Sequence, residues 1–279
     1  MKKYFCPYIV LAFFAVLLGG IPSKADAQSI RLKVITFNVK SFEMEDMSNQ
    51  ISFDVTPFAD FLRDENADII ILNEMENRSS RQQREGKYRD VVQELAEKLG
   101  MFGIFGYSYN LGNKKGDNPE ENYTYCMNEL YGNAILSKYP ILSSHAVQLP
   151  RPSGSADQRG ALVTEVVLPS GEIISVVATH LDHVGGQDEQ AKALISEKII
   201  SGKVPTILAG DMNSSVSSSA METVKSKFDL IANTWVDYIF VSKGKWKKIN
   251  EYVKESGNLS DHNAMISEIE LIKNKMLGI

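Results

Sequence analysis

The sequence is poor in the side chains that bind soft metals and form disulfide bonds. It contains two cysteines and four histidines in 279 residues. Cys6 lies in the N-terminal segment, so Cys126 has no intramolecular partner once that segment is removed. A zinc site needs three or four nitrogen, sulfur or carboxylate ligands. A disulfide framework is therefore excluded for the processed chain, and Cys126 is assigned no role.

Long apolar runs are absent after the first twenty residues. The N-terminus has two lysines, an apolar run at 8–20 and a small-residue pattern at Ala25 and Ala27. This order is typical of a secretory signal peptide cleaved before Gln28. The run is too short for a comfortable membrane span. We expect residues 1–27 to be a signal peptide, and the mature protein to be exported, periplasmic or extracellular, with no stable membrane span.

An excess of basic residues is absent as well. The formal net charge is −5, and removing residues 1–27, which contain three basic residues and one acidic residue, changes it to about −7. Proteins that bind duplexes tightly and without sequence preference neutralise several phosphates with Lys and Arg. The charge therefore favours small or single-stranded substrates. Linkers and repeats are also missing, so we expect one domain at 28–279 and a monomer.

Apolar segments of strand length recur along the chain. They predict strands at 30–39, 67–75, 131–137, 161–169, 172–180, 205–211, 236–242 and 263–271, and 141–149 is strand-like. Helices are predicted at 56–66, with Thr56 as N-cap, at 88–100, ending at Gly100, and around 187–200. Strands this apolar need cover on both faces. The sequence therefore predicts an α/β fold with sheets packed face to face and helices outside.

Four of the predicted strands end in a polar residue. These residues are Asn38, Glu74, His180 and Asp211. A polar residue that closes an apolar strand lies at the rim of a sheet, where loops assemble sites. One polar residue at a strand end is common in any fold. Four in one chain indicate that the rim of the sheet carries a functional site.

The segment "THLDHVGG" (179–186) suggests a zinc site at first sight. It resembles the histidine motif of the metallo-β-lactamase family, but one histidine is missing and the spacing is two residues short. His145 has no acidic neighbour in its segment, so zinc lacks ligands. The remaining candidates are carboxylates and amides, which suit hard cations such as Mg²⁺, Mn²⁺ or Ca²⁺. No phosphate-binding loop of the G-x-x-x-x-G-K-[ST] type and no G-x-S-x-G elbow occurs.

Eight short segments resemble the endonuclease/exonuclease/phosphatase superfamily, in the order in which the family has them. They are "TFNV" (36–39), "ILNEM" (71–75), "YGNAILSKYPI" (131–141), "QRGALV" (158–163), "ATHLDH" (178–183), "ILAGDMNS" (207–214), "VDYIFVS" (236–242) and "LSDHNAM" (259–265). Together they cover nearly the whole mature chain. Two departures stand out: the usual "LQE" is "LNE" here, with Asn73, and the stretch at 230–235 is shorter than usual.

The resemblance implies a four-layer α/β/β/α sandwich of two packed mixed sheets with outer helices, and divalent-metal-dependent phosphoester hydrolysis. By position, the implied metal ligands are Glu74, Asp261 and Asn38, and the implied catalytic residues are His180, Asp211, Asn213, Asp237 and His262. The metal would neutralise phosphate charge, the histidines and Asn213 would donate hydrogen bonds, and Asp211 would take a proton from water. Asp182 and His183 are then interpreted as loop residues.

Candidate substrate contacts come from four further residues. They are Arg78, Arg81, Asn133 and Arg159. An arginine fork matches phosphate oxygens, although the segment 77–89 is equally compatible with a solvated loop balanced by neighbouring glutamates. "KGKWKK" (243–248) is interpreted as a surface turn, with a nucleic-acid or membrane anchor through Trp246 as the alternative.

The predicted function is an exported phosphoester hydrolase of the phosphodiesterase or nuclease type with Mg²⁺ as cofactor, Mn²⁺ and Ca²⁺ being alternatives. Its substrate would be a nucleic acid, a lipid headgroup or a small phosphodiester. A phosphomonoesterase or lipid-headgroup hydrolase of the same fold is the first alternative, and a non-catalytic phosphate-binding module is the second.

Overall fold

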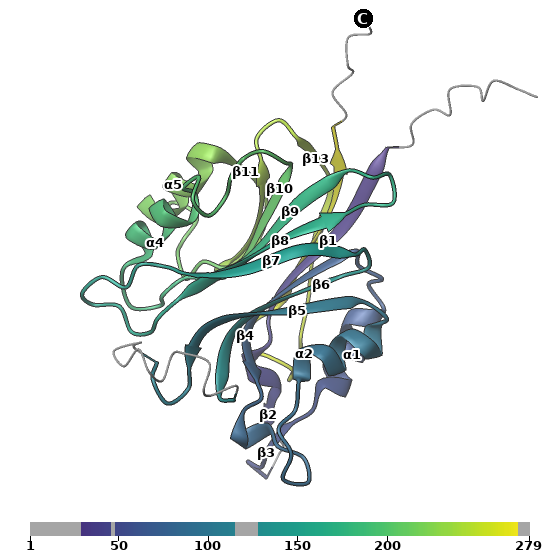
Figure 1. Ribbon diagram of the computed structural model, residues 1–279, viewed down its shortest axis with the longest axis vertical. Helices are drawn as coiled ribbons and strands as arrows, with labels where there is room; N and C mark the ends of the chain where they lie inside the picture. The colour runs from purple at the N-terminus through teal and green to yellow at the C-terminus, as the bar shows by residue number, and fades with distance from the viewer. Residues whose placement is uncertain (1–28, 46–47, 115–127, 273–279) are drawn as a thin grey trace, which may run out of the picture.

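The computed structural model describes residues 29–45, 48–114 and 128–272, in which two six-stranded mixed sheets pack face to face (Figure 1). The first sheet has the order β13-β14-β1-β4-β6-β5 and the second β11-β12-β10-β9-β8-β7. The first contains β1 (Ile30–Asn38), β4 (Ile69–Asn77), β5 (Phe102–Asn110), β6 (Leu130–Ser137), β13 (Trp246–Lys254) and β14 (Ala264–Leu271). The second contains β7 (Ile141–Gln148), β8 (Gly160–Val167), β9 (Ile173–His180), β10 (Thr206–Asp211), β11 (Phe228–Thr234) and β12 (Asp237–Ser242).

Each sheet contains one parallel pair among antiparallel neighbours. β1 runs parallel to β4 in the first sheet, and β9 runs parallel to β10 in the second. The four carboxyl ends are Asn38, the segment from Asn73 to Asn77, His180 and Asp211. Because parallel strands end at the same edge, each pair delivers two polar residues to one rim.

Helices cover the outer faces of both sheets, as Figure 1 shows. α1 (Val55–Arg63) and α2 (Val91–Leu99) pack on the first sheet, and α4 (Gln187–Leu194) and α5 (Ser219–Lys227) pack on the second. The remaining elements are the turns η1 (Lys40–Phe42) and η2 (Ser80–Gln82) and the hairpin of β2 (Glu43–Glu45) and β3 (Ile51–Phe53). This is the predicted four-layer α/β/β/α sandwich, so the expected fold class is confirmed.

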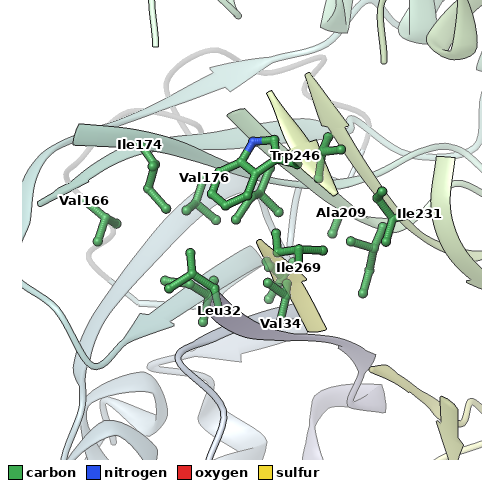
Figure 2. Close-up of a cluster of buried hydrophobic side chains, with 14 of the residues drawn as sticks. Leu32, Val34, Val166, Ile174, Val176, Ala209, Ile231, Trp246 and Ile269 are labelled. Carbon is green, nitrogen blue, oxygen red and sulfur yellow. The ribbon is translucent and has the colours of Figure 1, made fainter. Parts of the chain in front are cut away.

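The core between the sheets contains Trp246 (Figure 2). Its indole packs among aliphatic side chains, including Val176 and Ile269, and the residue is 5% exposed. The alternative of a nucleic-acid or membrane anchor through Trp246 is therefore wrong, whereas the predicted surface turn is present. The lysines of 243–248 are exposed on the β12–β13 turn and on β13, while the tryptophan points inward at the start of β13.

Several predicted boundaries differ from the structure. The N-cap of α1 is Asp54, whose side chain accepts from the Thr56 N–H, so Thr56 lies inside the helix. α2 does end at Gly100, which has the left-handed conformation that favours glycine. The α4 helix is shorter than 187–200, and β5, α5, β11 and β13 had no sequence prediction. Their apolar periodicity is weak because they lie at sheet edges or form short surface elements.

Two predictions concern residues outside the described part of the chain. These are the signal peptide at 1–27 and the absence of a role for Cys126. Within the described residues, no helix is long and apolar enough to cross a membrane.

One glycine beside the rim permits a close approach between strands. Gly210 on β10 has φ +142°, and a Cβ there would lie 1.9 Å from the Thr179 carbonyl oxygen of β9. No side chain fits such a gap. Gly210 therefore sets the spacing of the two strands that carry His180 and Asp211.

Candidate functional site

The ends of three strands from two different sheets are joined by one amide side chain. Asn38, at the end of β1, donates from Nδ2 to Glu74 Oε1 at 3.0 Å and to Asp211 Oδ2 at 3.1 Å. β1 and β4 belong to the first sheet and β10 to the second. The rim predicted from polar strand ends is therefore a single polar cluster that spans both sheets.

Asp211 occupies the centre of this cluster. Its Oδ2 lies 3.5 Å from His180 Nε2 and 3.7 Å from His262 Nε2, and its Oδ1 accepts the Asn213 backbone N–H at 2.9 Å. Burial raises the pKa of Asp211 to about 6, with a further increase from the charge of Asp237, while His262 opposes the shift. Asp211 is therefore a carboxylate at neutral pH and a stronger base than an exposed aspartate.

His262 is held in its charged form by Asp237. The His262 Nδ1 lies 2.7 Å from Asp237 Oδ2, and both residues are buried. Burial alone would lower the pKa of His262, but the hydrogen bond to Asp237 and the charges of Asp237, Asp211 and Asp261 raise it to about 9. With Nδ1–H directed at Asp237, the second proton on Nε2 faces Asp211.

His180 has the opposite electrostatic environment. Burial lowers its pKa well below the ordinary value, and the nearby charges of Arg159 and His262 lower it further. Arg159 Nη1 lies 3.1 Å from His180 Nδ1. A guanidinium can only donate, so Nδ1 faces a donor, while Nε2 faces both the Asn213 amide nitrogen at 2.9 Å and Asp211 Oδ2 at 3.5 Å. Both histidines therefore direct Nε2 toward Asp211, one from a charged ring and one from a neutral ring.

Asn213 lies beside His180 at the start of the loop after β10. Its Nδ2 donates to the Leu181 carbonyl oxygen at 2.9 Å and lies 2.9 Å from His180 Nε2. The residue has φ +45°. Asparagine tolerates this left-handed conformation better than most residues, which explains how the chain turns sharply after Asp211 and returns an amide to the cluster.

Asp182 is a loop anchor. It is fully buried and accepts four backbone N–H groups, from Ala156, Asp157, Val184 and Gly185, at 2.8 to 3.2 Å. His183 is exposed, and its Nδ1 lies 3.1 Å from Arg159 Nη2. These positions agree with the interpretation of both residues as loop residues. Of the two histidines in "THLDHVGG", only His180 lies next to Asp211.

The four candidate substrate contacts have protein partners of their own. Arg81 pairs with Glu76 and with Glu43, its guanidinium lying 2.9 Å from Glu43 Oε2. Arg78 donates from Nε to Asn128 Oδ1 at 3.0 Å. Asn133 is buried, accepts from Asn73 Nδ2 at 2.8 Å and donates to the Gly160 carbonyl oxygen at 3.1 Å. The fourth, Arg159, contacts both His180 and His183.

Two further residues adjoin the cluster: Asn73, which the sequence marked only as a departure from the family motif, and Trp235, which it did not single out. Asn73 donates to the Thr179 carbonyl oxygen at 2.8 Å and accepts the Asp211 N–H at 3.0 Å, so it joins β4 of the first sheet to β9 and β10 of the second. Trp235 is 68% exposed and lies with its ring centroid 4.9 Å from that of His262. The position of Trp235, two residues before the predicted catalytic Asp237, was the feature of the sequence that could have indicated its place beside the cluster.

One group of residues brings possible cation ligands close together, and a second group is implied by the family resemblance. Asp211, Asp237 and His262 offer atoms within 4.8 Å of one another. In this group, however, the His262 proton on Nε2 blocks its use as a ligand, because a nitrogen that binds metal must be deprotonated. The other group is Glu74, Asp261 and Asn38. Asn38 contacts Glu74, and Ser260, which donates to the Asn38 carbonyl oxygen at 2.7 Å, lies 3.4 Å from Asp261 Oδ1.

Comparisons with known proteins agree with this architecture. The model of the Endonuclease/Exonuclease/phosphatase family matches residues 35–262. An endonuclease/exonuclease/phosphatase from Beutenbergia cavernae is 20% identical, with a TM-score of 0.68 over 86% of this chain and 72% of that one. The human Nocturnin catalytic domain with bound sulfate is 17% identical, with a TM-score of 0.62 over 87% and 95%. ANGEL2, a 2′,3′-cyclic phosphatase, is 15% identical, with a TM-score of 0.62 over 87% and 96%. No curated protein matches the chain significantly.

Proposed function

Because this chain belongs to the endonuclease/exonuclease/phosphatase family, whose members hydrolyse phosphoester bonds, we propose that it is a divalent-metal-dependent hydrolase of the phosphodiesterase or nuclease type. One observation carries the proposal: Asp211 lies between two histidines of different charge, 3.5 Å from His180 and 3.7 Å from His262. A base flanked by a charged imidazole and a neutral imidazole suits a phosphorus atom that gains one oxygen and loses another.

Asp211 is the general base in this proposal. A pKa of about 6 leaves it ionised at neutral pH and places it close to the optimum for proton transfer from water. Two donors, the Asn38 amide and the Asn213 backbone N–H, fix its orientation. These two hydrogen bonds therefore hold the carboxylate of Asp211 in one orientation.

His262 is the general acid or charged donor. Its raised pKa keeps the ring protonated at neutral pH, and Asp237 fixes the ring through Nδ1. A charged donor stabilises the negative charge that develops on the leaving oxygen. The amide of Asn213 would donate to a non-bridging phosphate oxygen, and neutral His180, which lies between Arg159 and Asn213, would orient that amide.

The residues around the base fit a hard cation. Glu74, Asp211, Asp237 and Asp261 outnumber the nearby charged groups His262 and Arg159, and buried Asp237 Oδ1 has no hydrogen-bond partner among the described residues. Excess carboxylate oxygens of this kind suit Mg²⁺. Glu74 with Asp261 and Asn38 would hold the ion. When bound, it would neutralise phosphate charge as a Lewis acid.

The substrate class is proposed from the family and from one neighbour. The name of ANGEL2 describes it as a phosphatase of a 2′,3′-cyclic phosphate, which is a phosphodiester of a nucleotide. That chemistry favours the phosphodiesterase form of the proposal over a phosphomonoesterase or lipid-headgroup hydrolase. We also propose export of the mature chain from residue 28, in accord with the lysines and apolar run at its N-terminus.

The proposal is tested with bis(p-nitrophenyl) phosphate in Mg²⁺ and in EDTA. Glu74→Gln and His262→Gln should each lower metal-stimulated turnover by at least about 100-fold, a common loss for a catalytic group. The matched controls are Glu85→Gln and His145→Gln, which change exposed residues of the same types. Turnover that survives in both active-site variants, or that EDTA leaves unchanged, contradicts the proposal.

A further inference from the structure

Trp235 is a bulky residue in a strained, exposed position beside the proposed catalytic centre. It forms, with Val236, the two-residue connection between β11 and β12, since Thr234 pairs with Asp237. Its φ is +48°, in the left-handed region. Two-residue hairpin connections favour Asn, Asp or Gly, and a large side chain at positive φ is a genuine outlier. Folding alone therefore does not explain a tryptophan here.

The indole lies directly against one of the histidines proposed to act on the phosphate. The ring centroids of Trp235 and His262 are 4.9 Å apart, with the planes inclined by 41°. His262 is 8% exposed, whereas Trp235 is 68% exposed. The indole therefore covers the imidazole and still offers most of its own surface to solvent. Strained residues concentrate at functional sites, and Glu74 and Asn213 in the same cluster also have positive φ.

We propose that Trp235 is a stacking surface for an aromatic base of the substrate, which makes it a specificity-determining residue for nucleotide phosphodiesters. The inference rests on the proposed function and narrows its substrate class. A phosphate that accepts a hydrogen bond from His262 lies close to the indole as well, because the two rings are in contact, so its ester substituent can reach the indole. Every nucleobase has a flat face that can stack on an aromatic side chain.

The chemistry around Trp235 favours a base over a lipid surface. Asn233, two residues before Trp235, is exposed and uncharged, and exposed Asp261 contributes negative charge at His262, the ring that Trp235 contacts. Membrane anchors pair an aromatic residue with lysines or arginines that attract anionic headgroups. A nucleobase requires no such charge, since stacking depends on its π-face.

The first experiment compares two substrates that differ in one base. A thymidine dinucleotide is hydrolysed alongside the same compound with a base replaced by hydrogen. Trp235→Asn, which relieves the strained backbone, should lose about five- to 150-fold more kcat/KM on the base-bearing compound than on the abasic one, the range that one stacked base contributes. Trp235→Phe should retain most of the preference. Val184→Asn, a change of an exposed apolar residue on another loop, is the control.

The second experiment does not depend on turnover. Thymidine 5′-phosphate with Mg²⁺, but not deoxyribose 5-phosphate, should quench indole fluorescence in the unmodified chain and not in Trp235→Asn, because the other tryptophan, Trp246, is buried. Hydrolysis without base preference and without quenching overturns the stacking role and keeps the hydrolase. Quenching without hydrolysis of either compound keeps the stacking role and overturns the hydrolase. Binding to phosphatidylcholine vesicles that requires Trp235, with no base preference, also overturns the proposal.

Discussion

Replacing Asp182 by asparagine should destabilise the protein severely, although Asp182 is neither a predicted metal ligand nor a predicted catalytic residue and its one charged partner among the described residues is Arg159, 3.9 Å from Oδ2. Its Oδ2 accepts the N–H groups of Ala156 and Asp157, and its Oδ1 accepts those of Val184 and Gly185. These segments flank Arg159 and His180 in the sequence. One carboxylate thus fixes both loops next to the cluster.

The magnitude follows from counting the donors that lose their acceptor. Asparagine keeps one oxygen, and its amide nitrogen would face two backbone N–H groups. Each buried donor left without a partner costs about 1–3 kcal/mol, so Asp182→Asn should cost about 2–6 kcal/mol in a protein whose total stability is of order 5–15 kcal/mol. Urea unfolding at pH 7 measures this loss. The matched control is Asp188→Asn, which changes an acceptor for Ser219 at the surface and should stay within about 0.5 kcal/mol of the parent.

The pH dependence gives a second check. Burial raises the pKa of Asp182, but the four backbone donors outweigh it and the net pKa is lowered. A lowered folded-state pKa stabilises the folded protein above the unfolded value of about 3.9 and loses this contribution as the pH falls through the folded value. The stability gap between the parent and Asp182→Asn should therefore shrink below about pH 4. The reasoning is refuted if Asp182→Asn loses no more unfolding free energy at pH 7 than Asp188→Asn does. It is also refuted if the difference in unfolding free energy between the parent and Asp182→Asn stays the same in acid.

Three other outcomes are expected. Gly210→Ala should lower the urea midpoint sharply or prevent folding, because its Cβ would lie 1.9 Å from the Thr179 carbonyl oxygen; a parental midpoint would contradict the strand spacing. Asn133→Ala should lower the unfolding free energy by about 1–3 kcal/mol with KM unchanged, since both ends of its amide bind protein groups; raised KM at full stability would instead establish a substrate contact. Mg²⁺ at 100 times its Kd should stabilise the parent by about 2.7 kcal/mol and Glu74→Gln much less; equal thermal shifts would remove Glu74 as a ligand.

The sequence predicted the rim of the site because strand ends are local features. Asn38, His180 and Asp211 each close an apolar run, and the structure joins Asn38 and His180 to Asp211 by side-chain contacts within 3.5 Å. Sheets packed face to face with helices outside followed in the same way from strands that need cover on both faces, whereas the four-layer order was implied by the resemblance to the family. Helix ends were less predictable, since Asp54 rather than Thr56 caps α1 and either residue type serves as an N-cap.

What the sequence by itself determined is which residues close strands and which residue types are available for chemistry at the rim. Tertiary structure decided how each one behaves. His180 is neutral because it is buried and faces Arg159, His262 is charged because Asp237 faces it, and Trp246 is buried while Trp235 is exposed. Charge state and exposure depend on partners 21 to 25 residues away or on the opposite sheet. These partners come together only when the two sheets pack, and a local sequence pattern does not show which residues will meet.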